Sequence, residues 1–369
     1  MALNCGIVGL PNVGKSTIFS ALTAAPAEAA NYPFCTINPN LGIVDVPDGR
    51  LEMLVSKFTP KKRVPATVEF VDIAGLVKGA SKGEGLGNQF LSHIREVNVI
   101  AQVVRCFEDP DIVHVNNRVD PADDMETVNL ELAFADLDTV EKRLEKAGRS
   151  MRVLGGDEKK TAAAMAAVLE KLKPLLADGK AARTAGLNDD ERLAIADCHL
   201  ITAKPMLYVC NCAEDTVRNP SPHVEAVKKI TQAEDAEVVC ICGKFEAELA
   251  ALESAAERAE FLAEIGLEES ALASLARGVY RLMGLRTFFT AGEDECRAWT
   301  IRAGDTAPKA AGVIHSDFER GFIKAEVYSF DDLVTYGTPA RIREAGKYRM
   351  EGRDYVVRDG DVLFFKFNV

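Results

Sequence analysis

The hydrophobic and polar positions of the chain follow two different periods, and the change between them divides the sequence. Residues 2 to about 125 alternate short apolar runs with glycine-rich or polar turns and helical patterns, and the apolar runs cover residues 5–9, 68–72 and 97–107. Continuous apolar runs separated by helical patterns are typical of a parallel sheet whose two faces are both covered. We therefore predict an α/β core for this part of the chain.

From about Thr127 the apolar residues fall three and four apart, which is the spacing of a helix with one apolar stripe. The stripe consists of Leu130, Ala133, Leu137, Val140, Leu144, Ala147, Met151 and Leu154. Gly155 and Gly156 end it, and a second stripe carries Met165, Leu169, Leu172 and Leu176. The two helices are expected to close as an antiparallel hairpin, the first about 40 Å long at ~1.5 Å per residue. The hairpin is either a solvated structural arm or an arm that binds a partner.

Buried-strand character returns at residues 204–212 and 236–242, so the hairpin is predicted to be inserted into the α/β core. After about Met283, strand patterns at residues 297–301, 323–329, 355–357 and 362–367 accompany a helical pattern at residues 308–314. The predicted domains are a nucleotide-binding core of residues 1–126 and 200–283, a helical hairpin of residues 127–199, and a small mixed domain of residues 284–369.

Composition and charge narrow the class of protein. The chain has 369 residues, of which 47% are hydrophobic and 27% charged, with no apolar stretch near the ~18 residues of a membrane helix. We expect a cytoplasmic protein with no membrane partner. The net charge of −12 argues against coating nucleic acid, so no DNA partner is expected, but it leaves room for one local basic surface. The nine cysteines lack paired metal-type spacing, and we interpret them as reduced, buried thiols rather than disulfide or zinc ligands.

The chemistry of the chain begins in a glycine-rich loop after the first apolar run. Residues 9–16 read G-L-P-N-V-G-K-S and fit G-x-x-x-x-G-K-[ST], between a predicted strand and a helical pattern. In this motif backbone amides surround the phosphates, Lys15 places its charge at the β and γ phosphates, and the Ser16 hydroxyl ligates Mg²⁺. The predicted nucleotide-binding residues of this loop are Asn12, Val13, Gly14, Lys15, Ser16 and Thr17.

A second phosphate motif, D-x-x-G, ends the apolar run at residues 68–72. Asp72 is expected to reach Mg²⁺ through water, and the Gly75 amide is expected to touch the γ-phosphate. Four glycines follow between residues 79 and 87. We predict that this segment orders when γ-phosphate is present and relaxes after hydrolysis.

Residues 31–40, between the two motifs, make a resemblance to a known family specific. They read N-Y-P-F-C-T-I-N-P-N, and N-x-x-E at residues 211–214, R-A-W-T-I at residues 297–301 and the C-terminal D-G-D-V-x-x-F-x-F-N-V accompany them. Together with the first loop and the inserted arm, these motifs resemble the Obg-like ATPase family, also known as YchF, over essentially the whole chain. The resemblance implies a C-terminal TGS domain of β-grasp fold, ribosomes as the recurring partner, and slow hydrolysis of ATP. It also implies that Thr36 completes the Mg²⁺ shell.

The predicted base-recognition loop differs from that of ordinary G proteins, which use N-K-x-D after a buried strand. The chain has Asn211 and Glu214 with Cys212 between them. The longer Glu214 side chain and the short Cys212 side chain remove the contacts that hold guanine. We predict that Asn211 and backbone carbonyls read adenine, and that Cys242 and Gly243 form the far side of the base site. The alternative is an ordinary loop that leaves a strand.

The position that carries a water-orienting Gln in many small G proteins is Leu76, so slow intrinsic turnover is expected. His114 is the histidine near the loops of the phosphate end, and it either orients water, senses the switch, or packs in an ordinary loop. Asn12 is a candidate ligand for a monovalent cation such as K⁺. Cys35, beside Thr36, is the thiol whose oxidation would disturb switching.

These patterns predict Mg²⁺-dependent hydrolysis of ATP, in preference to GTP, that times binding to the ribosome or another translation component. The predicted catalytic residues are Lys15, Gly75 and His114, and the predicted metal ligands are Ser16, Thr36 and Asp72. One alternative is a GTPase of the same fold. The other is a nucleotide-gated binding module for which hydrolysis is incidental.

A local basic run in the C-terminal part is the candidate contact for ribosomal RNA. It consists of Arg341, Arg343, Lys347, Arg349 and Arg353, and the only acidic residues among them are Glu344 and Glu351. The alternative is a solvated face with no partner.

Overall fold

The computed structural model describes residues 3–24, 40–73, 86–115, 118–153, 155–216, 219–234, 236–252 and 254–368. The chain forms two compact units. Among the described residues, unit 1 comprises those within 3–24, 40–42 and 69–275, and unit 2 comprises those within 43–68 and 276–368.

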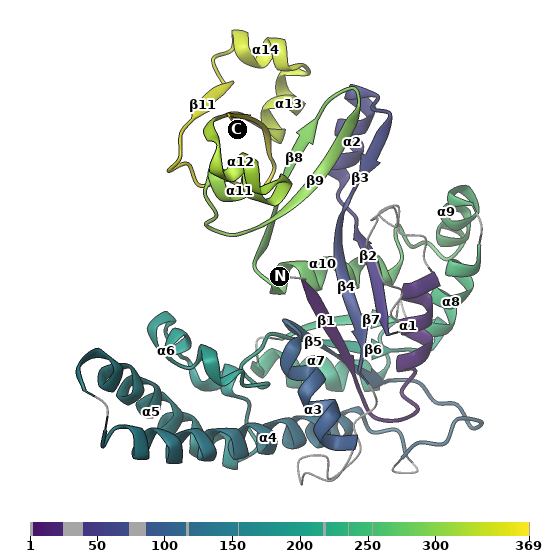
Figure 1. Cartoon of the computed structure of the whole chain (residues 1–369). Helices are drawn as coiled ribbons and strands as arrows, with labels where there is room; N and C mark the ends of the chain where they lie inside the picture. Colours follow the sequence, from purple (N-terminus) through teal and green to yellow (C-terminus); the bar gives the residue numbers. More distant parts are fainter. Residues whose placement is uncertain are drawn as a thin grey trace. The chain divides into compact units, whose positions relative to one another are not determined.

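The first sheet has six strands in the order β2-β4-β1-β5-β6-β7 (Figure 1). They are β1 (Asn4–Val8), β2 (Leu41–Val46), β4 (Ala66–Asp72), β5 (Val99–Arg105), β6 (Met206–Asn211) and β7 (Glu237–Ile241). β1 pairs in parallel with β4 and β5, and the parallel pairing continues through β6 to β7. β5 and β6 are buried at every position, which explains their continuous apolar sequences. The carboxyl ends of these strands meet at one edge, where parallel sheets bind ligands.

Helices complete unit 1 around this sheet. They are α1 (Lys15–Ala24), α3 (Leu86–Glu96), α7 (Pro222–Glu234), α8 (Gly243–Ala251), α9 (Ala255–Glu264) and the start of α10 (Ala271–Leu282). α1 packs against α8, whereas α7 packs against β6 and β7. The predicted α/β core is thereby confirmed.

The helical arm consists of α4 (Pro121–Ser150), α5 (Gly156–Ala177) and the short α6 (Asp189–Ala194). α4 begins at Pro121, earlier than the predicted Thr127, because Asp120 caps it by accepting from the Asp123 amide. It ends at Ser150, before the predicted Leu154. The arm lies in sequence between β5 and β6, which pair directly, so the predicted insertion is confirmed.

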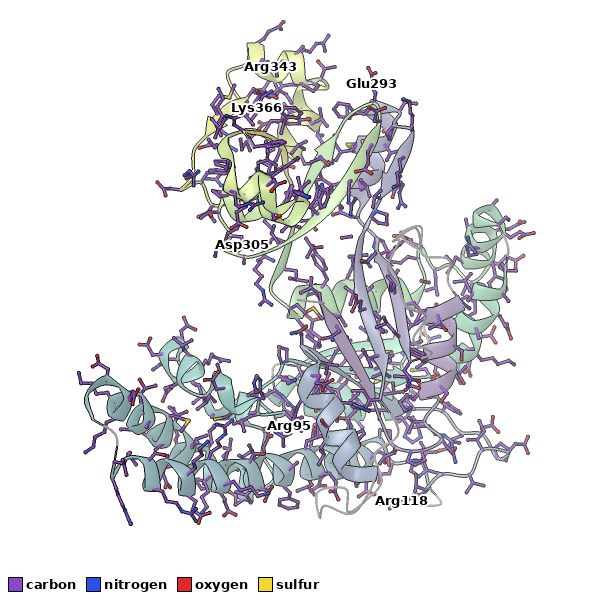
Figure 2. All side chains as sticks on the ribbon, viewed as in Figure 1. Arg95, Arg118, Glu293, Asp305, Arg343 and Lys366 are labelled. Carbon is purple, nitrogen blue, oxygen red and sulfur yellow. The ribbon has the colours of Figure 1, made fainter. Side chains whose placement is uncertain are left out.

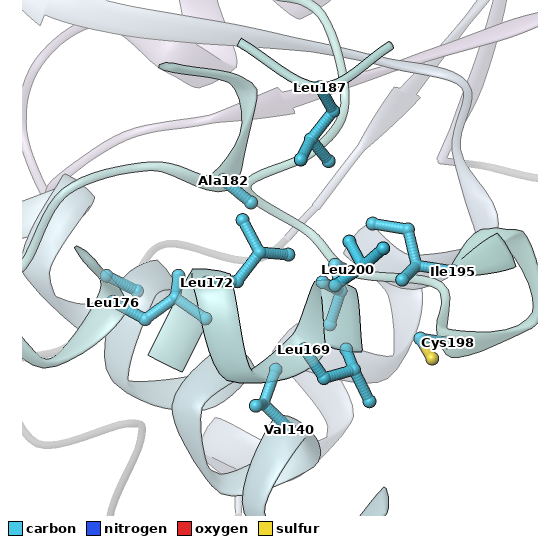
Figure 3. Packing of buried hydrophobic residues seen from close by; sticks show 11 residues of the cluster. Val140, Leu169, Leu172, Leu176, Ala182, Leu187, Ile195, Cys198 and Leu200 are labelled. Atoms are coloured by element: carbon cyan, nitrogen blue, oxygen red, sulfur yellow. The ribbon is translucent and has the colours of Figure 1, made fainter. Parts of the chain in front are cut away.

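A buried apolar cluster holds α4 and α5 together, and it uses the whole second predicted stripe and the middle of the first, from Ala133 to Leu144. Val140 of α4 packs with Leu169, Leu172 and Leu176 of α5, and the chain that returns to the sheet adds further apolar contacts. Arg95 of α3, which Figure 2 labels, donates to Thr139 Oγ1 of α4 at 2.9 Å. The close view in Figure 3 shows the apolar cluster between the helices. The arm therefore has a core of its own.

The second sheet is mixed, with the strand order β11-β10-β12-β8-β9-β3. Its strands are β3 (Lys62–Val64), β8 (Leu285–Ala291), β9 (Glu295–Arg302), β10 (Phe322–Ser329), β11 (Arg349–Glu351) and β12 (Asp361–Phe367). Its helices are α2 (Gly49–Phe58), α11 (Ala307–Ile314), α12 (Ser316–Arg320), α13 (Phe330–Tyr336) and α14 (Pro339–Glu344). The predicted strand at residues 355–357 is wrong, because this segment pairs with the chain before α11 only through Val356 and Thr306.

The compact units differ from the predicted domains at residues 43–68, which belong to unit 2 together with the C-terminal part. The reason is the pairing of β3 with β9, in which Lys62 lies opposite Glu295. Arg50 of α2 adds an ion pair of 2.7 Å to Asp359. These contacts join segments far apart in the sequence, which a local pattern does not reveal.

The cysteines that the structure describes are all free, and every one except the half-buried Cys240 is buried. Within the described ranges, no helix has both the length and the apolar character needed to cross a membrane.

Candidate nucleotide-binding site

The carboxyl edge of the first sheet carries a cavity of about 870 Å³. The first loop, the loop after β5, and the residues that follow β6 and β7 form its walls. Of the predicted nucleotide-binding residues, Asn12, Gly14, Lys15, Ser16, Thr17, Asn211, Glu214 and Cys242 line this cavity. The structure thus brings together residues that are separated by more than half the chain.

The first loop has the backbone shape that its glycines allow. Asn12 and Gly14 have positive φ angles of 62° and 90°, respectively. A Cβ atom on Gly14 would lie 2.0 Å from Asn211 Nδ2, so glycine is required at this position. α1 begins at Lys15, directly after the loop. Because the first amides of a helix lack partners within the helix, this end of α1 favours an anion.

Asn211 connects the first loop to the start of α8. Its Nδ2 donates to the Val13 carbonyl at 2.9 Å, and its Oδ1 accepts from the Gly243 amide at 3.0 Å. The side chain is 5% exposed. Each polar atom of this amide has one backbone partner, which leaves a second N–H on Nδ2 and a second lone pair on Oδ1, and Asn211 also lines the cavity. Adenine recognition by Asn211 therefore stays a prediction. We call the two hydrogen bonds of the Asn211 side chain the brace. Its backbone partners are Val13 and Gly243, which we predicted to bind nucleotide directly.

Lys15 and Asp72 are in direct contact beside the cavity. Lys15 Nζ lies 2.8 Å from Asp72 Oδ1, and both side chains are largely buried. The predicted phosphate-binding lysine therefore neutralises the predicted metal-binding carboxylate. Thr36 and Gly75, together with Cys35 and Leu76, lie outside the described residues.

His114 is buried against the start of α4 and does not line the cavity. Its Nε2 lies 2.9 Å from Asp124 Oδ2. Burial raises the pKa of Asp124, and the hydrogen bond to His114 opposes this effect. A catalytic role for His114 stays a prediction, because the ring would have to leave Asp124 to reach a bound nucleotide.

Asn12 is tied to the loop that carries His114. Its Nδ2 donates to the Val113 carbonyl at 3.0 Å. Since the amide nitrogen is only a donor, the Oδ1 oxygen is the atom of this side chain that a cation such as K⁺ would use.

The loop after β5 forms one wall of the cavity, and the sequence interpretation missed it. Phe107, Glu108, Asp109 and Ile112 line the cavity from this side. Arg105, 1% exposed, donates to the carbonyls of Phe107, Asp109 and Ile112 at 3.1, 3.2 and 2.9 Å. An arginine at the end of an apolar run was the available signal, because a buried guanidinium requires several acceptors.

Lys244 is a second missed residue of the cavity wall. It follows the Gly243 amide that Asn211 fixes, and its side chain is exposed. Its ammonium adds a positive charge to a cavity that Glu214 also lines.

The α/β fold and a glycine-rich loop at the carboxyl edge of its sheet define a P-loop nucleotide-binding protein. A family model described as "50S ribosome-binding GTPase" matches residues 4–141. The model YchF-GTPase_C, described as "Protein of unknown function (DUF933)", matches residues 285–368.

The chain is 53% identical to the Ribosome-binding ATPase YchF of Bacillus subtilis (strain 168), with 100% of both chains covered. It is 52% identical to the protein of the same name from Escherichia coli O157:H7, again with 100% of both chains covered. A solved structure of the Schizosaccharomyces pombe YchF GTPase has 40% identity and a TM-score of 0.88, covering 99% of this chain and 97% of that chain. The chain therefore belongs to the YchF family, as the sequence motifs indicated.

Proposed function

We propose that the chain is a Mg²⁺-dependent ATPase of the cytoplasm whose nucleotide state times its binding to the ribosome. The cavity at the carboxyl edge supports nucleotide binding, and the names of the bacterial relatives support ATP and a ribosomal partner. The observation that carries the choice of ATP is the position of Glu214 and Cys212. Both line the cavity where a G protein has the Asp and Lys that hold guanine.

The phosphate end of the cavity fits a nucleotide with Mg²⁺. Lys15 would transfer its charge from Asp72 to the β and γ phosphates, which releases the Asp72 carboxylate toward the metal. Among the described residues, no group of three or more His, Cys, Asp or Glu side chains is arranged to hold a metal ion. Mg²⁺ would take the Ser16 hydroxyl and obtain most other ligands from phosphate and water, which suits its preference for few protein ligands. When bound, the ion neutralises charge that develops on the phosphates.

The base end of the cavity combines an exposed carboxylate with a buried thiol. Glu214 is exposed and Cys212 is buried, with its thiol donating to the Cys210 carbonyl at 3.2 Å. The second N–H and the second lone pair of the Asn211 amide, together with backbone groups near Cys212 and Cys242, are the groups that would read adenine at this end. K⁺ at Asn12 Oδ1 and a water-orienting role for His114 belong to the same proposal.

A GTPase is the second candidate activity, favoured by the family model that covers residues 4–141 and by the name of the yeast relative. A nucleotide-gated binding module is the third, and the separate apolar core of the arm is the observation that favours it.

The test is to measure ATP and GTP turnover of the purified chain with and without ribosomes, at fixed Mg²⁺. We expect ATP turnover that exceeds GTP turnover and rises when ribosomes are added. Lys15→Ala should abolish turnover, because Lys15 is the side-chain charge at the phosphates. Lys142→Ala on the exposed surface of α4 is the matched control and should keep full turnover.

Three results separate the candidates. Equal turnover of Lys15→Ala and the parent chain would refute the phosphate site. A preference for GTP would replace the ATPase with a GTPase. Ribosome binding that is the same with ATP, with ADP and in Lys15→Ala would leave hydrolysis incidental.

A further inference from the structure

Over β10, β11 and β12, the second sheet has a stretch of surface that its core does not use. Ala325 and Val327 of β10, with Leu363 and Phe365 of β12, pack into the buried cluster beneath α11. Because side chains alternate along a strand, the residues between them point to the opposite face. We call this the outer face, and it comprises Lys324, Glu326, Met350, Phe364 and Lys366.

The strand register places these five residues side by side. Lys324 lies opposite Lys366, and Glu326 lies opposite Phe364. On the other side of β10, Met350 of β11 lies opposite Glu326. The outer face is therefore one continuous surface over β11, β10 and β12, with two lysines at one end and Phe364 near its centre.

Phe364 is unusually exposed for a phenylalanine in the middle of a strand. It is 57% exposed, as is Met350, whereas Phe365 beside it is 7% exposed. The ammonium of Lys366 lies 4.2 Å from the centre of the Phe364 ring. An exposed aromatic ring beside exposed cations is the arrangement that proteins use to stack a nucleic-acid base.

Positive charge prevails at the outer face, although the whole chain is acidic. Lys324, Lys366 and Arg343 of α14 stand against a single acid, Glu326, which both Lys366 and Arg343 approach at 3.6 and 3.5 Å. Figure 2 labels Lys366 and Arg343 in this unit. A chain with a net charge of −12 that gathers cations around an exposed ring offers local complementarity to an anionic strand.

The structure also divides the basic run that the sequence predicted as the RNA contact. Arg349 donates to the Tyr355 hydroxyl at 3.2 Å, and Arg353 donates to the Phe322 carbonyl at 3.0 Å. These two arginines therefore have partners within the unit. Arg341, Arg343, Lys347 and Arg353 are exposed, and Arg349 is half-buried. Arg343 also lies 4.1 Å from the centre of the Tyr348 ring and 3.5 Å from Glu326, so it connects the cations of α14 to the outer face.

We propose that the outer face binds single-stranded RNA, with one base stacked on Phe364 and the neighbouring phosphates held by Lys324, Lys366 and Arg343. A flat ring needs an unstacked base as its partner, and an A-form duplex keeps its bases stacked. The ribosomal source of this RNA rests on the function proposed above, whereas the affinity for single-stranded RNA does not.

The test measures binding of a fluorescently labelled single-stranded oligouridine and a labelled RNA duplex to the full chain by fluorescence anisotropy. We expect the single strand to bind more tightly than the duplex. Phe364→Ala should weaken binding to the single strand about tenfold, and Phe364→Trp should preserve it, because stacking needs a ring. Phe364→Leu should behave like Phe364→Ala. Lys324→Ala should reduce the slope of log affinity against log salt by about 0.7, the value for one phosphate contact.

Val313→Ala is the matched control, because Val313 is 45% exposed on α11, which covers the other face of the sheet. None of these side chains lines the nucleotide cavity, so ATP turnover should be the same in every variant. Binding of the single strand that is unchanged in Phe364→Ala would overturn the proposal. A second result would also overturn it. If Phe364→Ala lost ribosome co-sedimentation while Phe364→Leu kept it, and both variants bound the single-stranded RNA like the parent chain, an apolar contact with a protein would occupy this face. Absence of ATP turnover would contradict the proposed function and leave this result intact.

Discussion

The carboxyl edge of the first sheet and the helical arm belong to the same unit, but different interactions hold them in shape. At the edge, the buried side chains of Asn211 and Arg105 bond to backbone atoms of neighbouring loops. In the arm, a buried apolar cluster holds the helices, and ion pairs such as Lys142 with Asp138 lie on the surface. The buried carboxylate of Asp136, which accepts from the Ile201 and Thr202 amides, resembles the edge in this respect. A hydrogen bond fixes distance and direction, whereas an apolar contact mainly excludes water. The edge is therefore built for a defined geometry and the arm for stability.

The largest effect should follow the loss of the brace at the edge. Asn211→Ala leaves the Val13 carbonyl and the Gly243 amide without their partner, and each unpaired buried group costs about 2 kcal/mol. Because nucleotide binding must then restore the positions of the two loops, the affinity for ATP should fall about a thousandfold. Titration with a fluorescent ATP analogue measures this fall. Asn129→Ala, which removes a single hydrogen bond to Tyr208 of β6, is the matched control and should bind ATP nearly as well as the parent chain. An equal loss in both variants would mean that general stability, not the brace, sets affinity.

The second effect tests the arm. Leu172 of α5 is fully buried in the apolar cluster, so Leu172→Ala should lower the free energy of opening of α4 and α5 by about 3 kcal/mol. Amide hydrogen exchange of the two helices measures this energy. Leu193→Ala on α6 is the control, because Leu193 is 76% exposed. The affinity of the free protein for ATP should not change in either variant. A weaker affinity in Leu172→Ala would break the comparison by showing that the arm supports the cavity.

Sequence reasoning reached the parts of this protein that local patterns encode. Lys15, Ser16 and Asp72 sit in short contiguous motifs, and the apolar stripes defined the two helices of the arm before their packing was known. The brace at Asn211 could not be predicted, because it joins residues from three distant segments. The three hydrogen bonds of Arg105 were missed for a different reason. The arginine at the end of an apolar run indicated a need for acceptors, but those acceptors are backbone carbonyls, which every residue provides.

The third effect concerns Glu246, a buried carboxyl group near the carboxyl edge of the first sheet. Glu246 lies in α8, whose first turn reaches the cavity wall, and its Oε1 accepts from the Ala271 amide at 2.7 Å. Burial raises the pKa of Glu246 to about 7, and the backbone hydrogen bonds only partly oppose this effect. Since the pKa is higher in the folded state, Glu246 favours folding below its ordinary pKa, and this contribution is lost as the pH rises to about 7.

Glu246→Gln should therefore raise the free energy of unfolding of the chain at pH 8 by on the order of 2 kcal/mol. The neutral amide keeps the acceptor for Ala271 and removes the buried charge. Near pH 4.5 the difference from the parent chain should vanish, because Glu246 is then protonated. Urea unfolding across this pH range measures both limits, and Glu248→Gln on the same helix is the control. A constant difference at every pH would show that packing, not ionisation, distinguishes the two chains.

The smallest expected effect concerns the choice of base. Glu214 is exposed at the cavity and Cys212 is buried beside it, so Glu214→Asp is the gentler change and Cys212→Lys must extend a longer stem into the cavity. Together they restore the guanine-binding pattern, and the ratio of GTP to ATP affinity should rise about tenfold, which corresponds to about 1.4 kcal/mol. Glu214→Asp alone should produce only part of the shift, because the ring cover that Lys would supply is still absent. Asn211 keeps the loops in place in all three chains, so a change in selectivity would come from the base contacts themselves. Competition between unlabelled ATP and GTP for a bound fluorescent analogue measures the ratio. A preference of the parent chain for GTP would mean that the Glu214 carboxylate reaches guanine despite its greater length. The cavity at the carboxyl edge of the sheet would then be a GTP site.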